Sequence, residues 1–121
     1  MIENAMVVGL DAHYARQDRL DDEDSAVYAE IVAEFRAAIV TGGHVNWCVY
    51  NSLASGVYKL GVTPINEAIL ECIDYDEVRP LFMALVKTPS AQASEALQEA
   101  MAQRWARLYA DDTAEYRRAF A

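Results

Sequence analysis

Apolar residues recur at helical spacing in the first half of the chain. One series occupies every fourth position: Val27, Ile31, Phe35 and Ile39. Because an α-helix turns once every 3.6 residues, this spacing gathers the apolar side chains on one face. Asp24 suits the N-cap of this helix, and Gly42-Gly43 suits its end. An opening helix from about Glu3 to Arg16 precedes it.

A second stripe lies in the last third of the chain and consists of Leu97, Met101, Trp105 and Leu108. It predicts another amphipathic helix, followed by a short last helix that begins at Asp112 or Thr113 and ends at Phe120. Thr-Pro pairs at 63–64 and 88–89 predict two further helix starts, since Thr can cap and Pro fits the first turn. Between them, Pro80 separates a helix ending near Asp74 from a shorter one over 81–86.

The stretch from His44 to Tyr50 fits two interpretations. Alternation of Val45, Trp47 and Val49 with polar residues suits a strand. A helix continued to residue 60 would instead gather aromatic side chains on one face, namely Trp47, Tyr50 and Tyr58. A lone strand leaves backbone groups unpaired, and no other segment is clearly a second strand. We therefore expect a helix here.

Together these elements predict an all-α fold: a single compact helical bundle of about six helices over residues 1–121, with irregular orthogonal or up-down packing. A chain of this length suits one domain, and its 54% hydrophobic residues exclude wholesale disorder. The longest apolar run, Leu81 to Val86, is too short to cross a bilayer, and the N-terminus lacks the order of a secretory signal. Two cysteines do not make a disulfide framework, so a reduced, cytoplasmic protein is expected.

The charge balance narrows the function more than any motif. The chain has 19 acidic and 10 basic residues, and residues 1–43 alone have nine acids against three bases. Residues 44–62 contain no acid, and Lys59 is their single base. An acidic surface repels phosphate and attracts basic surfaces, so direct nucleic-acid binding is disfavoured. The glycines form no phosphate-binding pattern.

Three groups of side chains suggest chemistry without defining a site. His44 and Cys48 are four residues apart, which on a helix would bring them to one face as a Cys–His pair, or as half of a zinc site completed by Cys72 and His13. Glu67 and Glu71 also share a helix face, but the Glu-x-x-His step of a di-iron site is missing. Buried thiols and solvated carboxylates explain these residues more simply. We expect no catalytic residue, metal or cofactor.

The sequence therefore predicts a non-enzymatic acidic interaction protein. Its character is that of a small inhibitor or immunity-type protein, of phage or mobile-element origin, that occludes a basic, nucleic-acid-handling or toxin partner. Acidic and aromatic side chains are the candidate partner-binding residues: Asp18, Asp21, Asp22, Glu23, Asp24, Glu67, Glu71, Asp74, Trp47, Tyr50 and Tyr58.

Two alternatives remain open at this point. One is a small helical enzyme or ligand-binding domain that uses His44 and Cys48, or Glu67 and Glu71. The other is a structural subunit of a homo-oligomer, because the run Leu81 to Val86 exceeds what one buried helix face requires.

Overall fold

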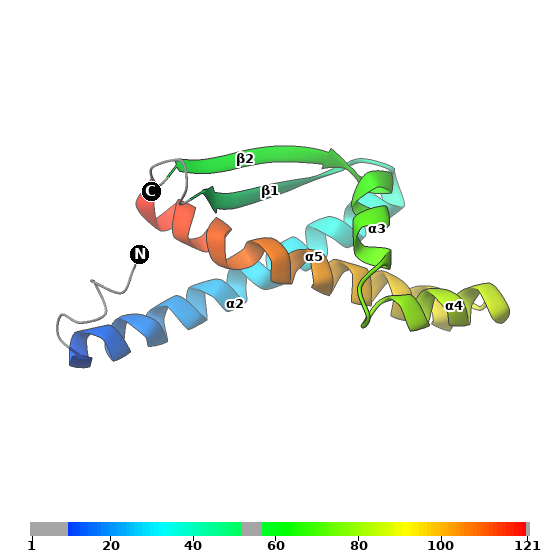
Figure 1. Ribbon diagram of the computed structural model, residues 1–121, viewed down its shortest axis with the longest axis horizontal. Coiled ribbons are helices and arrows are strands. Elements are labelled where there is room, and N and C mark those ends of the chain that lie inside the picture. The colour runs from blue at the N-terminus through cyan, green and yellow to red at the C-terminus, as the bar shows by residue number, and fades with distance from the viewer. Residues whose placement is uncertain (1–9, 52–56, 121) are drawn as a thin grey trace.

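The computed structural model describes residues 10–51 and 57–120, with side chains for residues 25–50 and 57–120. In this part of the chain the elements follow the order α2 (Leu10–Thr41), β1 (His44–Asn51), β2 (Val57–Pro64), α3 (Ile65–Ile73), α4 (Arg79–Lys87) and α5 (Ala91–Ala119). Figure 1 shows the β-hairpin lying along one side of the two long helices. The prediction of an all-α bundle of about six helices is therefore wrong.

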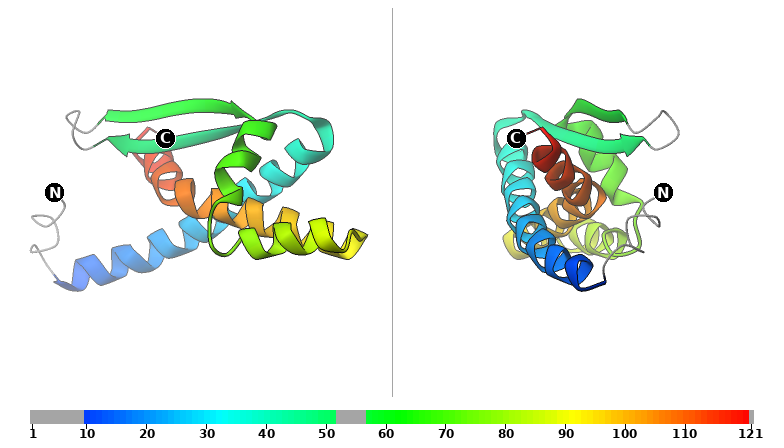
Figure 2. Two further views of the ribbon diagram at one scale, coloured as in Figure 1. Left: turned by 45° about the vertical axis from the view of Figure 1, so that its right-hand side comes forward. Right: turned by 90° about the vertical axis from the view of Figure 1, so that its left-hand side faces the viewer.

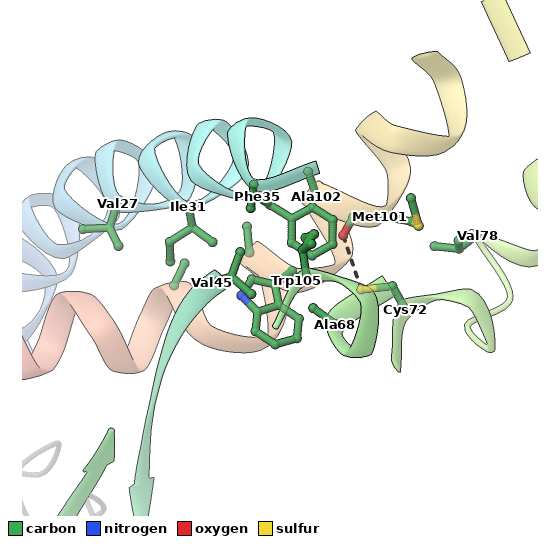
Figure 3. Packing of buried hydrophobic residues seen from close by; sticks show 14 of the residues in the cluster. Val27, Ile31, Phe35, Val45, Ala68, Cys72, Val78, Met101, Ala102 and Trp105 are labelled. Carbon is green, nitrogen blue, oxygen red and sulfur yellow. Dashed lines mark hydrogen bonds between the residues drawn. The ribbon is translucent and has the colours of Figure 1, made fainter. Parts of the chain in front are cut away.

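The two long helices form the centre of the molecule. Their buried residues are Val27, Ile31, Phe35 and Ala38 on α2, and Leu97, Met101, Ala102, Trp105, Ala106, Ala110 and Ala114 on α5. Phe35 and Trp105 are both fully buried, with ring centroids 5.8 Å apart. Figure 3 shows them meeting Val45 of β1 and Ala68 and Cys72 of α3. Both predicted apolar stripes thus face the core, although Ile39 and Leu108 are only partly buried.

Both long helices continue past their predicted breaks. The α2 helix covers 32 residues, so Asp24 lies inside it and is not an N-cap. The α5 helix covers 29 residues and passes through Asp112 and Thr113 without interruption. Short polar residues favour caps but do not end a helix whose apolar face remains packed. Gly42 does end α2, with a φ of 71° that suits glycine.

The stretch from His44 is a strand, so the helix expected there is wrong. β1 pairs with β2 in antiparallel register, from His44 opposite Pro64 to Asn51 opposite Val57. β2 is inconspicuous in the sequence because it contains Lys59, glycine and proline, and because half of its residues are exposed and none is fully buried. Its burial pattern therefore lacks the alternation that identifies a strand.

The remaining helix ends agree only in part with the sequence predictions. Pro80 does separate two helices, since α3 ends at Ile73 and α4 begins at Arg79 with proline in its first turn. The Thr-Pro caps, however, are wrong. Thr63 lies in β2, and Ser90 rather than Thr88 caps α5 by accepting a hydrogen bond from the Ala93 N–H.

None of the helices in residues 10–51 and 57–120 has the length and hydropathy that a membrane-spanning helix needs.

We expect Gly61→Ala to destabilise the fold. A Cβ at this position would lie 2.1 Å from the ring of Trp47, whose indole N–H also donates to the Thr63 hydroxyl at 2.9 Å. Since overpacking costs about 1–3 kcal/mol, urea unfolding followed by circular dichroism should show a loss of that size. Gly43→Ala is the matched control, because its Cβ meets only the Thr41 hydroxyl, at 3.1 Å. An equal loss in both variants would contradict this account.

Candidate protein-binding surfaces

The α3 helix presents an exposed acidic face. Glu67, Glu71 and Asp74 follow the helical repeat, and all three are exposed. Leu70 lies beside them and keeps 66% of its surface accessible. We call these four residues the α3 acidic face. The spacing in the sequence predicted that the three carboxylates share one side of a helix, and they do.

Elsewhere in the described part of the chain, the arginines form ion pairs with acids. Every arginine between residues 25 and 120 whose side chain is described lies in an ion pair: Arg36 with Glu95 and Glu99, Arg79 with Asp76, Arg104 and Arg107 with Glu77, Arg117 with Glu30, and Arg118 with Glu115. None of these pairs involves a carboxylate of the α3 acidic face. The described arginines are therefore engaged with other acids, although Arg79 also donates a hydrogen bond to the backbone carbonyl of Asp74.

The ion pairs also connect the elements. Arg36 reaches from α2 to two glutamates on α5, one of them Glu99 at 2.8 Å. Hydrogen bonds from Gln103 and then Arg36 lower the pKa of Glu99. Arg104 holds Glu77 at 2.7 Å while its guanidinium lies 4.3 Å from the ring centroid of Tyr75. These contacts keep the paired acids ionised and fix them against the helices.

The predicted acidic run from Asp18 to Asp24 lies on α2, and its side chains are outside the described residues. Two other N-terminal acids have structural partners. Glu30 pairs with Arg117 at 2.5 Å, and Glu34 accepts a hydrogen bond from the backbone N–H of Asn46 at 3.1 Å. These two carboxylates serve the fold instead of adding to an acidic surface.

The aromatic side chains do not form the single stripe that a helix would produce. In the hairpin, Trp47 of β1 lies on the opposite face from Tyr50 of β1 and its partner Tyr58 of β2. It packs against Tyr109 of α5, with ring centroids 6.1 Å apart, and covers Gly61. The prediction that these three residues share a face is therefore wrong.

Tyr50 and Tyr58 belong instead to an aromatic cluster at the end of the hairpin nearer residues 51 and 57. Their rings are 5.0 Å apart across the strands, and Tyr58 lies 5.4 Å from Tyr116 and 6.1 Å from Phe120 of α5. Tyr50 is 48% exposed and Phe120 67% exposed. This cluster fixes the end of α5 to the hairpin, at the end of the strands opposite α3.

His44 and Cys48 cannot act as a pair. A strand separates residues four apart by about 13 Å, whereas a helix would bring them together. His44 is exposed, while Cys48 is buried and its thiol donates to the backbone carbonyl of Asp112 at 3.8 Å. Burial, and then the charge of Asp112, raises the pKa of Cys48. A raised pKa disfavours the thiolate, which is the form needed for nucleophilic attack or metal binding.

Cys72 is still less suited to chemistry. It is fully buried, and its thiol donates to the Met101 carbonyl at 3.5 Å (Figure 3). Burial raises its pKa to about 12. The described residues contain no group of three or more potential metal-binding side chains, and His13, the remaining candidate zinc ligand, lies where side chains are not described.

The exposed apolar side chains of β2 were not predicted from the sequence. Val57, Leu60 and Val62 are each more than half exposed. Because the stretch up to residue 60 was expected to be helical, no pattern in the sequence indicated that these side chains would be exposed along a strand. The run Leu81 to Val86, in contrast, divides between two sides of α4: Leu81 and Leu85 pack against the core, while Met83 and Val86 are exposed.

Comparison with known protein families, curated proteins and solved structures finds no match to this chain.

The Cys72 thiol should make stability depend on pH in the alkaline range. Folding raises its pKa from an ordinary value of 9.0 to about 12, so the unfolded chain loses this proton first. The resulting contribution to the free energy of unfolding is complete below about pH 9 and is lost as the pH rises toward about 12. We expect Cys72→Ala to be less sensitive to pH over this range than the native protein.

Urea unfolding at about pH 8 and about pH 10.5 measures this difference, and the Cys72→Ala variant is the control for all other titrating groups because it lacks only this thiol. If the native protein and the Cys72→Ala variant lose equal stability between the two pH values, Cys72 does not titrate as the structure requires.

Proposed function

We propose that this is a non-enzymatic binding protein whose α3 acidic face docks against a basic surface of a partner protein. One observation supports the proposal above all. Glu67, Glu71 and Asp74 are exposed and outside the ion pairs, while every described arginine is engaged with another acid. These three carboxylates therefore leave negative potential on α3, where it would steer a basic partner into contact.

Leu70 gives this surface an apolar contact among the charges. It lies one turn or less from all three carboxylates and is 66% exposed. Interfaces typically combine an apolar contact that loses water with charged groups around it. A partner with Lys and Arg side chains around an apolar depression would match this arrangement. Binding would then block that partner's basic surface, as an inhibitor or immunity-type protein does.

The enzymatic alternative loses its main residues. Cys48 is buried and its thiol pKa is raised, and His44 lies four residues away along the same strand, at about 13 Å. Glu67 and Glu71 contribute to the proposed docking surface instead. The proposal places the protein in the cytoplasm, where two unpaired thiols such as Cys48 and Cys72 are ordinary.

The charge of α3 should decide whether a basic partner is retained. The protein is immobilised, exposed to a lysate of its source cells, and washed at about 50 mM and about 0.5 M salt. We expect the native protein to retain a basic protein at low salt only. The combined variant Glu67→Gln and Glu71→Gln should weaken binding of the purified partner about tenfold or more, since two charge contacts are lost.

Asp111→Asn is the matched control for the single variant Glu71→Gln, because each removes one charge from an exposed carboxylate outside the ion pairs named above. This control should bind as the native protein does. Equal weakening in both variants would mean that only net charge matters, and retention that is insensitive to salt would overturn the charge-based mechanism.

A further inference from the structure

The outer edge of β1 is covered by the long helices. The backbone N–H groups of Asn46 and Tyr50 point away from β2 and donate to the carboxylates of Glu34 and Asp112, at 3.1 and 3.0 Å. The Asn46 carbonyl accepts from the indole N–H of Trp105 at 3.5 Å. Side chains from α2 and α5 thus supply several of the hydrogen bonds that a neighbouring strand would otherwise make.

The directions of these backbone groups in β1 also show which backbone groups of β2 form its open edge. In an antiparallel pair, opposed residues alternate between those that exchange backbone hydrogen bonds and those that do not. The backbone N–H groups of Asn46 and Tyr50 point away from β2. The backbone N–H and carbonyl groups of their partners, Val62 and Tyr58, must therefore point away from β1, as must those of Leu60 between them. In Figures 1 and 2, β2 lies on the side of the hairpin away from α5. Within the described residues the sheet consists of β1 and β2 alone.

Only one register lets this edge pair well with itself. With Leu60 opposite Leu60 of a second copy, Tyr58 lies opposite Val62 and all three outward residues exchange backbone hydrogen bonds. A register centred on Lys59 would place like charges opposite each other, which is destabilising. One centred on Gly61 would oppose Tyr58 to Pro64, which has no N–H to donate. The strand is therefore self-complementary about Leu60.

The composition of the hairpin favours a second copy over a basic partner at this edge. Residues 44–62 contain no acid, so two copies meet here without opposing carboxylates although each chain has a net charge of −9. The exposed apolar side chains Val57, Leu60 and Val62 all lie on this strand. An edge that is both apolar and open is a template for strand pairing.

From these observations we propose that β2 pairs with β2 of a second copy in antiparallel orientation, centred on Leu60, so that two hairpins form one continuous four-stranded sheet. Tyr58 then contacts Val62 across the strands, an aromatic–β-branched pair of the kind that stabilises sheets. Lys59 then lies opposite Gly61 of the partner copy, on the face of the hairpin where the ring of Trp47 covers this glycine. The pairing is independent of the proposed docking by α3, which lies beyond Pro64 at the end of the strand.

The test is the molar mass in solution over a wide range of concentration, measured by light scattering. We expect the native protein to shift from monomer to dimer as concentration rises. Leu60→Arg should abolish the dimer, because it places two guanidinium groups opposite each other; circular dichroism checks that this exposed substitution leaves the fold intact. Val40→Arg is the matched control, since Val40 is also exposed and apolar but lies at the end of α2. It should dimerise as the native protein does.

The register is tested with Leu60→Cys and a short thiol-reactive crosslinker. Crosslinked dimer should form readily at position 60 and about tenfold less with Val57→Cys, which pairs with residue 63 in this register. The native thiols are buried, so the unmodified chain serves as the blank.

A native protein that stays monomeric at every concentration overturns the proposal, and so does a Leu60→Arg variant that still dimerises. The Glu67→Gln and Glu71→Gln variant should remain dimeric, which separates this inference from the proposed docking by α3.

Discussion

The structure depends on the antiparallel contact between α2 and α5 at Trp105. This side chain is fully buried, packs on Phe35 of α2, and donates its indole N–H to β1. A two-stranded sheet is only marginally stable in water by itself. Here the helix pair supplies both the apolar surface under the hairpin and the polar groups along the outer edge of β1. Remote side chains, Glu34 and Asp112, thus allow β1 to exist as a strand.

The same helix contact organises the charges. Arg36 and Arg117 join the long helices through acids on the opposite helix, and Arg104 and Arg107 hold Glu77 in the turn before α4. Each exposed pair contributes little to stability. Their larger effect is on the distribution of charge, because the bases are concentrated where the helices meet. Among the described residues, the carboxylates of the α3 acidic face stay outside these pairs.

The sequence predicts those parts of this fold that depend on residues close together in the chain, and it misses those that depend on residues far apart. The apolar stripes containing Phe35 and Trp105 are local patterns, and they placed the core faces of both long helices correctly. The hairpin was missed because its stabilising partners lie 12 to 62 residues away along the chain, as with Glu34 to Asn46 and Asp112 to Tyr50. The acidic face of α3 was recognised from its spacing, whereas the separation of Trp47 from Tyr50 required knowledge of the strand.

The covered edge of β1 also limits how far a sheet of this protein can extend. Glu34 and Asp112 occupy the outward N–H groups of β1, so the hairpin presents one pairing edge and not two. When β2 of a second copy pairs with β2, the helix-covered strand β1 of each copy forms an outer edge of the enlarged sheet. Assembly through this strand is therefore closed after one addition. An exposed apolar edge, which in other proteins leads to open-ended fibrils, is here compatible with a discrete particle.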